Sequence, residues 1–356
     1  MDQLQPIIDK IQDHTRVDSD EGLIILREMD FLTLASLANR KRYYYHPDKM
    51  VTFVIDRNIN YTNICISGCR FCAFYKQPGA TYENDGGYVI SQDSLFKKIE
   101  ETIELGGTQI LLQGGMNPDL DIAYYVTLLE NIKDNFDIHI HGFSPPEIDY
   151  IADKSGLSIS KTISVLQAAG LSSIPGGGAE ILNDEIRRKV SPNKCRAEKW
   201  LEVMRQAHLQ GMRSSATMMF GHFEQDYHII EHLEKLRCLQ DETKGFTAFI
   251  PWTFQPGNTK INARNRTSVE YLRVLAVSRL YLDNIENIQV SWVTQGDKIA
   301  QTALFFGAND MGSTMIEENV VASAGVDFML PKQELIRLIK TAGFEPRQRD
   351  CYYHLL

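Results

Sequence analysis

Three of the six cysteines of this chain fall within eight residues, at Cys65, Cys69 and Cys72, in a C-x3-C-x2-C pattern. Three thiolates in one short loop can hold a metal centre from one side. A structural zinc site normally takes four ligands in two separated C-x2-C pairs, and the sequence contains no second pair. A cuboidal 4Fe-4S cluster also takes four cysteines as a rule, so three leave one iron free for another ligand. The pattern favours such a cluster, with zinc or an unligated redox loop as alternatives.

Charge and composition exclude several classes of protein. The chain has 37 Lys plus Arg and 46 Asp plus Glu, which gives a net charge of −9. An acidic chain without a basic run argues against non-specific nucleic-acid binding, and the absence of any long apolar stretch argues against a membrane span. Residues 1–20 lack the basic start and apolar core of a signal peptide. We therefore expect a cytoplasmic protein whose thiols stay reduced.

Short β-prone runs alternate with amphipathic helical stretches from about residue 58 onward. One such stretch follows the cap Ser91 and carries Leu95, Ile99 and Ile103 at every fourth position. This alternation implies parallel strands with right-handed crossovers, and eight units favour a closed (β/α)8 barrel of the TIM type. A six-unit partial barrel is the alternative. The expected strands span residues 59–65, 108–113, 138–143, 171–174, 213–220, 246–250, 288–292 and 303–306.

Two regions are expected along the chain. Residues 1–50 should form a helical N-terminal extension, and residues 51–356 the barrel domain with a C-terminal helix. Thr314 and Glu317 have the spacing of a capping box, which predicts a helix from there to Gly325. Either kind of barrel places the active site at the carboxyl ends of the strands.

Two glycine-rich turns follow expected strands. Gln113, Gly114 and Gly115 end the second strand, where glycine suits either a tight turn or a close approach of the backbone to a ligand. The run 175–180 after the fourth strand is no dinucleotide fingerprint, because residue 181 is isoleucine. Its glycines would let the backbone approach a ligand while Glu180 accepts hydrogen bonds from ribose hydroxyls; the alternative is an ordinary surface carboxylate.

Three histidines are candidates for the site. His139 and His141 alternate with isoleucines on the third strand, so both point to one face, which is the lumen if the isoleucines face the helices. Core histidines are more often structural, but ordinary pKa values near neutrality would suit proton transfer. His222 follows the fifth strand, where barrel active sites are built.

Two further segments leave expected strands. Trp252 and Phe254 belong to an aromatic, proline-stiffened segment after the sixth strand, for which core packing is the alternative. Asn309 and Asp310 follow the eighth expected strand, where they could equally form a turn.

The pattern C-x3-C-x-aromatic-C, with Phe71 as the aromatic residue, resembles the signature of the radical S-adenosylmethionine (SAM) superfamily. The resemblance implies that Cys65, Cys69 and Cys72 hold a 4Fe-4S cluster and that SAM chelates the fourth iron. One electron then releases methionine and a 5'-deoxyadenosyl radical, while the protein supplies position and excludes water. The SAM-binding residues that it implies are Phe74, Gln113, Gly114, Gly115, Ser144 and Glu180.

Longer matches, over 60–63, 72–75, 139–147 and 216–222, resemble the synthases of the futalosine pathway and of the deazaflavin cofactor. Within this group, residues 250–256 resemble the cyclic dehypoxanthinyl futalosine synthases of menaquinone biosynthesis. The resemblance implies that the radical takes hydrogen from the ribose C4' of dehypoxanthine futalosine. The carbon radical then adds to the benzoate ring, which loses one proton and one electron.

The same resemblance implies roles for individual residues and a partner. Substrate contacts are expected from His139, Trp252, Phe254 and Asn309, and a base from among His222, His141 and Asp310. The substrate carboxylate should meet a cation, for which Arg188, Lys298 and Arg349 are the candidates. A one-electron donor such as flavodoxin or ferredoxin is implied as the partner.

Two alternatives to this function stay open. The first is an enzyme like aminofutalosine synthase, which joins an adenosyl group to a substituted benzoate. The second, from a different class, is a protein that binds a metal or cluster without catalysis.

Overall fold

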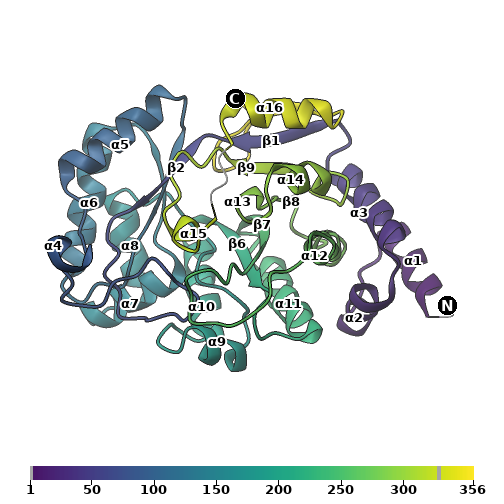
Figure 1. Ribbon diagram of the computed structural model, residues 1–356, viewed down its shortest axis with the longest axis horizontal. Coiled ribbons are helices and arrows are strands. Elements are labelled where there is room, and N and C mark those ends of the chain that lie inside the picture. Colours follow the sequence, from purple (N-terminus) through teal and green to yellow (C-terminus); the bar gives the residue numbers. More distant parts are fainter. Residues whose placement is uncertain (1–2, 327–329) are drawn as a thin grey trace.

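Seven parallel strands form the main sheet of the computed structural model, which describes residues 3–326 and 330–356 (Figure 1). Each strand pairs with the next one along the chain, in the order β2-β3-β4-β5-β6-β7-β8. Parallel neighbours need crossover connections, and these contain the helices. The strands are β2 (Asp56–Asn60), β3 (Gln109–Gln113), β4 (His139–Gly142), β5 (Ser173–Ile174), β6 (Arg213–Phe220), β7 (Phe246–Thr253) and β8 (Asn287–Ile288).

A second sheet, of order β10-β1-β9, links the two ends of the first. β1 (Met50–Val54) pairs in parallel with both β10 (Glu345–Gln348) and β9 (Asp310–Ser313). β1 runs into β2 with only Ile55 between them, and β9 bridges to Gln289, directly after β8. Backbone pairing therefore continues from β8 through β9 to β1, and the α/β barrel expected from the sequence is confirmed.

Helices cover the outside of the curled sheet (Figure 1). Their apolar stripes face the strands; in α5, for example, Ser91 caps the helix and Leu95 and Ile99 are buried. The helices between β2 and β8 are α4 (Tyr82–Asp85), α5 (Gln92–Glu104), α6 (Ile122–Asn135), α7 (Pro145–Ser155), α8 (Ile159–Ala169), α9 (Asp184–Val190), α10 (Ala197–Leu209), α11 (Asp226–Thr243) and α12 (Ser268–Tyr281). After β8 come α13 (Trp292–Gln295), α14 (Asp297–Ala303), α15 (Val320–Ser323) and α16 (Lys332–Thr341).

Three helices precede β1, namely α1 (Leu4–Gln12), α2 (Ser19–Glu28) and α3 (Phe31–Tyr45). α3 packs against α12, and α2 packs against α11 and α12. Buried residues of these helices belong to the same hydrophobic cluster as the barrel. The N-terminal helices thus share a core with the barrel, beside α12 (Figure 1).

Some expected elements differ from the observed ones. The expected strand at 303–306 is wrong, because these residues form the end of α14 and the turn after it. β9 takes its place seven residues later, and β1 and β10 were not expected. The capping box at Thr314 is also wrong, since Ser313 ends β9 and α15 begins at Val320. The first expected strand begins earlier, at Asp56.

Within residues 3–326 and 330–356, the helices are all too short or too polar to cross a membrane.

Candidate active site

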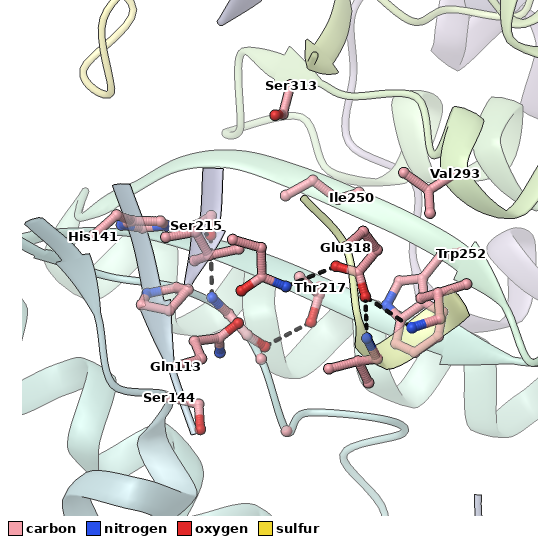
Figure 2. Close-up of a pocket in the computed structure, with 18 of the residues that line it drawn as sticks. Gln113, His141, Ser144, Ser215, Thr217, Ile250, Trp252, Val293, Ser313 and Glu318 are labelled. Carbon is pink, nitrogen blue, oxygen red and sulfur yellow. Dashed lines mark hydrogen bonds between the residues drawn. The ribbon is translucent and has the colours of Figure 1, made fainter. Parts of the chain in front are cut away.

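The inward face of the sheet surrounds a cavity of about 410 Å³ (Figure 2). Successive side chains of a strand point to opposite faces, so on β7 Ala248, Ile250 and Trp252 line the cavity while Phe249 is buried on the other face. Many inward side chains are polar, as suits a polar ligand. The side chains of β2, β3 and β6 that line the cavity are the polar Asp56, Asn58, Asn60, Gln109, Gln113, Ser215 and Thr217 and the apolar Leu111.

The cysteine loop follows β2, at the carboxyl ends of the strands, and all three of its cysteines line the cavity. The hydroxyl oxygen of Ser67 lies 3.1 Å from the sulfur atoms of both Cys65 and Cys69. The backbone N–H of Met116 donates to the sulfur of Cys65 at 3.3 Å. Such donors stabilise negative charge on sulfur, as the ligands of an iron–sulfur cluster require.

Burial controls the ionisation of these thiols. It raises the pKa of Cys69 to about 11. It also raises the pKa of Cys72, against the opposing effect of backbone N–H groups from Phe74 and Tyr75. Metal ligands must be thiolates, so binding of a metal centre here releases protons.

The distances between the three cysteine sulfur atoms indicate whether the loop suits an iron–sulfur cluster or a single metal ion. In the part of the chain that the structure describes, the group of three metal-ligating side chains with all ligand atoms within 4.8 Å of one another is His139, His141 and Cys351. The three loop cysteines do not form such a group, whereas one zinc ion with bonds of about 2.3 Å would need its sulfur ligands closer together. The loop therefore fits a cluster better than a single zinc ion.

The turn after β3 lies directly against the cysteine loop. A Cβ atom added at Gly115 would stand 2.2 Å from the carbonyl oxygen of Ile64 and 2.8 Å from the Cβ of Cys65. The N–H of Gly114 donates to the carboxylate of Glu147 at 2.9 Å. The glycines therefore let the turn pack closely against the cysteine loop, and an approach of this backbone to a ligand stays a prediction.

Glu147 was not predicted from the sequence, although it is the capping residue of α7. Its carboxylate accepts hydrogen bonds from Gly114, from the hydroxyl of Tyr61 at 2.7 Å and from the N–H and hydroxyl of Ser144. Gln113 and Ser144 themselves line the cavity. One buried carboxylate therefore fixes α7, the glycine turn and β2 together.

Glu180 lines the cavity and is 3% exposed, which rules out the surface reading. Its φ of 46° is in the left-handed region, a strained conformation that often marks a functional position. Its carboxylate pairs with the ammonium group of Lys194 at 2.9 Å. Burial acts to lower the pKa of Lys194, but attraction to Cys69 and Glu180 outweighs it and the pKa is raised. Lys194 also lines the cavity and was missed from the sequence.

His141 lines the cavity beside Ser215, and His139 lies outside it (Figure 2). The hydroxyl of Ser173 lies 2.6 Å from Nδ1 of His141, 2.7 Å from Nε2 of His139 and 3.4 Å from the sulfur of Cys351. Burial lowers the pKa of His141 to about 3 and that of His139 to about 4. Both imidazoles are therefore neutral and weakly basic, contrary to the expected pKa near neutrality.

His222 does not line the cavity. Its side chain is fully buried, with the N–H of Phe223 donating to Nδ1 at 2.8 Å and Nε2 lying 3.0 Å from the carbonyl oxygen of Met219. Burial lowers its pKa. Both ring nitrogens contact backbone groups, and Nδ1 also lies 3.1 Å from a carboxylate oxygen of Glu224, so the ring is held away from the cavity.

Of the residues expected at the site after the sixth and eighth strands, one lines the cavity and the other three do not. Trp252 lines the cavity, whereas Phe254 is 2% exposed and packs beside His222. Asn309 precedes β9 and Asp310 is its first residue, at the opposite end of the strands from the cysteine loop, and neither lines the cavity. Asn309 accepts a hydrogen bond from Arg279 at 2.7 Å. The misplaced eighth strand explains why both were expected at the site.

Two more charged residues, Glu318 and Arg349, line the cavity. Glu318, missed from the sequence, lines the cavity and accepts a hydrogen bond from Asn58 at 2.7 Å (Figure 2). Burial raises its pKa. Of the three expected cations, Arg349 lines the cavity, whereas Arg188 and Lys298 are exposed elsewhere.

A barrel with a three-cysteine loop at the carboxyl end of its first main strand defines a class, and comparison with known proteins names it. Residues 59–236 match the profile of the radical SAM superfamily, and residues 243–356 match the CofH/MqnC C-terminal region. The chain belongs to the radical SAM superfamily.

Within this superfamily, the chain is similar over most of its length to enzymes with two different names. The chain is 44% identical, over 98% of its length and 94% of the relative's, to the cyclic dehypoxanthine futalosine synthase of Halalkalibacterium halodurans. It is 41% identical, over 99% and 89%, to the protein of the same name from Streptomyces coelicolor. It is also 42% identical, over 86% and 89%, to the 5-amino-6-(D-ribitylamino)uracil--L-tyrosine 4-hydroxyphenyl transferase of Archaeoglobus fulgidus.

Solved structures agree with the fold. The hydrogenase maturase HydG from Carboxydothermus hydrogenoformans superposes with a TM-score of 0.75 at 16% identity, covering 99% of this chain and 81% of that one. Methylornithine synthase (PylB) superposes with a TM-score of 0.71 at 17% identity, covering 96% and 97%. At such low identity the likeness concerns the fold alone.

Proposed function

We propose that this protein is a radical SAM enzyme that cyclises dehypoxanthine futalosine to cyclic dehypoxanthine futalosine, in menaquinone biosynthesis. The observation that carries the proposal is the 44% and 41% identity to two synthases of this name, which extends over nearly the whole chain. The cavity that joins the cysteine loop to a polar lumen supports it.

The cofactors of this reaction are a 4Fe-4S cluster and SAM. Cys65, Cys69 and Cys72 would hold the cluster. SAM, bound to the reduced cluster, supplies a 5'-deoxyadenosyl radical. For the contacts to SAM we propose Phe74, Gln113, Gly114, Gly115, Ser144 and Glu180, all of which line the cavity.

The protein's own part is to hold the substrate and exclude water. A sugar carbon must lie in near-attack contact with the radical centre, and Trp252 can hold the benzoate ring from the side of β7. Of the four residues expected to touch substrate, Trp252 is retained in this proposal, because His139, Phe254 and Asn309 lie outside the cavity wall.

Loss of the ring proton needs a base. Among the expected candidates His141 alone lines the cavity, and its low pKa makes it a weak acceptor. We assign the proton to Glu318, a half-buried carboxylate of the cavity wall, because burial raises its pKa and a carboxylate with a raised pKa is a stronger base than an ordinary one. A Glu318→Gln variant should keep substrate binding and lose turnover, and an unchanged kcat would refute the assignment.

The partner and the location are part of the same proposal. A small-molecule substrate and a one-electron donor such as flavodoxin or ferredoxin fit a cytoplasmic radical SAM enzyme. We also propose that residues 1–50 form a helical extension to the barrel domain, 51–356; the helices up to Tyr45 and the start of β1 at Met50 support this division. Residues 1–2 and 327–329 lie outside the described residues.

One anaerobic experiment separates the candidate reactions. Reconstituted, reduced protein is given SAM with dehypoxanthine futalosine, with the substituted benzoate of aminofutalosine synthesis, or with tyrosine plus 5-amino-6-(D-ribitylamino)uracil. The last pair tests the second candidate, which the 42% identity to the hydroxyphenyl transferase favours. We expect conversion with dehypoxanthine futalosine. Conversion with either other set, in place of it, would overturn the proposal.

A further inference from the structure

The C-terminal segment, residues 349–353, forms the part of the cavity wall that lies away from the cysteine loop. Arg349, Cys351 and Tyr353 all line the cavity. The N–H of Arg349 donates to the carbonyl oxygen of Phe53 in β1 at 2.9 Å, just before β2 begins. The cysteine loop follows the other end of β2. The segment therefore closes the lumen at the amino ends of the strands.

Arg349 is a buried cation in a fixed position. It is 4% exposed, and its Nε and Nη2 donate to the two carboxylate oxygens of Asp310 at 2.5 and 3.0 Å. Nη2 also donates to Gln289 at 3.4 Å, and Nη1 to the carbonyl oxygen of Asp350 at 3.0 Å. A guanidinium carries five N–H groups, so one on Nη1 has no acceptor among the described residues.

Tyr353 offers a second free donor beside the first. Its ring packs on the guanidinium of Arg349, with 3.9 Å from the ring centre to the central carbon. Its hydroxyl oxygen is buried and has no hydrogen-bond partner in the described part of the chain. Its φ of 69° is in the left-handed region, which is costly for tyrosine. An orphaned buried hydroxyl in a strained residue is expected where a ligand completes the bonding.

Charge limits the kind of ligand. Within the described residues, the cations that line the cavity are Lys194 and Arg349. Lys194 is paired with Glu180 beside the cysteine loop, and Arg349 is paired with Asp310 at the other end, where one N–H of its Nη1 has no acceptor among the described residues. A guanidinium N–H of Arg349 and the hydroxyl of Tyr353, from two residues that line one cavity, match the two oxygens of a carboxylate. Asp310 does not reach the cavity but holds the guanidinium in its plane.

We propose that Arg349 and Tyr353 bind the carboxylate of the substrate, so that the C-terminal segment determines specificity for a carboxylated ring. This inference rests on the proposed function, whose substrate carries a benzoate. Binding at this end places the benzoate deep in the lumen and the sugar toward the cysteine loop. Asp310, which acts through Arg349, is a positioning residue.

The test uses the full, reconstituted protein and a Tyr353→Phe variant. This variant removes only the hydroxyl, which has no partner without ligand, so the fold and SAM binding should be unaffected. The dissociation constant for dehypoxanthine futalosine is measured anaerobically with SAM and without reductant. We expect it to rise about ten- to a hundredfold, the loss typical of a hydrogen bond to a charged group. KM should rise by a similar factor, with a smaller change in kcat.

Two comparisons make the result specific. Tyr352→Phe removes the neighbouring hydroxyl, which donates to the carbonyl oxygen of Ser172 outside the cavity, and should leave substrate affinity unchanged. A substrate analogue with a carboxamide in place of the carboxylate should bind the wild-type protein weakly, and Tyr353→Phe should weaken it little further. Arg349→Lys keeps the charge but loses the planar guanidinium with its several N–H donors, and should also raise KM.

The outcomes distinguish this inference from the proposed function. If wild-type protein converts dehypoxanthine futalosine but Tyr353→Phe binds it as tightly as wild type, the carboxylate site is refuted. Equal affinity of the wild-type protein for the carboxylate and the carboxamide would refute it as well. If wild-type protein fails to convert dehypoxanthine futalosine at all, the proposed function itself is wrong.

Discussion

At the scale of the residue, two side chains of the cavity wall belong to residues with energetically unfavourable backbone conformations. Glu180 and Tyr353 both have φ in the left-handed region, at 46° and 69°, and both line the cavity. Each lies beside a cation, the half-buried Lys194 in one case and the buried Arg349 in the other. Strained residues at both ends of one cavity mark the positions where ligand contacts matter most.

The cysteine assignment is tested by a single substitution. Cys69→Ala should abolish the visible absorbance of the reconstituted cluster and the reductive cleavage of SAM, because two thiolates cannot hold the cluster in place. Cys238→Ala, on the exposed side of α11, is the matched control and should keep both. SAM cleavage at the wild-type rate in Cys69→Ala would rule out this ligand set.

The glycine turn offers a second test at this scale. Gly115→Ala would place a Cβ atom 2.2 Å from the Ile64 carbonyl, so the turn and the cysteine loop must separate. We expect the iron content after reconstitution to fall several-fold. Gly156→Ala, at the positive-φ cap of α7 with open space around it, should cost about 1 kcal/mol of stability and leave iron content unchanged. Full iron content in Gly115→Ala would contradict the close contact.

Sequence patterns predicted the cysteine loop, the glycine turns and Glu180, because each is a local signal. They did not predict Lys194 or Tyr353, whose importance comes from neighbours distant in the sequence. The histidines show the same limit. Alternation correctly placed His141 on the inward face, but only the packing around it decides that burial lowers its pKa to about 3.

At the scale of the element, strand direction and alternation explain most of what was predictable. Parallel runs bounded by amphipathic helices predicted the order of the main sheet. The apolar run 303–306 wrongly predicts a strand, because a short apolar run occurs both in strands and at the ends of helices. β1 and β10 pair over nearly 300 residues of sequence, a contact with no local signal.

At the contacts between elements, the free energy of unfolding should depend most strongly on the carboxylate of Glu147, in the capping box of α7. Glu147→Ala removes an acceptor shared by Tyr61, Gly114 and Ser144, and leaves their buried donors unpaired. We expect a loss of about 2–4 kcal/mol in the free energy of unfolding. Chemical denaturation of the cluster-free protein measures it. As a control, Glu185→Ala on the exposed surface of α9 should cost less than about 1 kcal/mol, and an equal cost for both variants would refute the role of Glu147.

At the scale of the whole molecule, buried histidines link stability to pH. Burial lowers the pKa of His46, His139 and His208 to about 4 and that of His141 and His232 to about 3. In the unfolded chain a histidine has a pKa near 6.5. Below that pH the unfolded chain binds protons that the folded protein does not, so stability is full above 6.5 and is lost as pH falls toward 4.

The free energy of unfolding should depend steeply on pH. Each such histidine can contribute up to about 1.4 kcal/mol per pH unit between pH 6.5 and its folded pKa. Urea unfolding of the cluster-free protein at pH 7.5, 6.0 and 5.0 measures the change, and a His208→Asn variant should show a shallower slope. Equal stability at pH 7.5 and 5.0 would show that these histidines are not buried as neutral groups.

The central claim is that this barrel couples SAM cleavage to ring closure in dehypoxanthine futalosine. The most direct measurement is mass analysis of both products of one anaerobic reaction with reduced protein. We expect 5'-deoxyadenosine and, in equal amount, a product lighter than its substrate by two hydrogen atoms. Formation of 5'-deoxyadenosine with unchanged dehypoxanthine futalosine, or of an adduct that retains adenine, would contradict it.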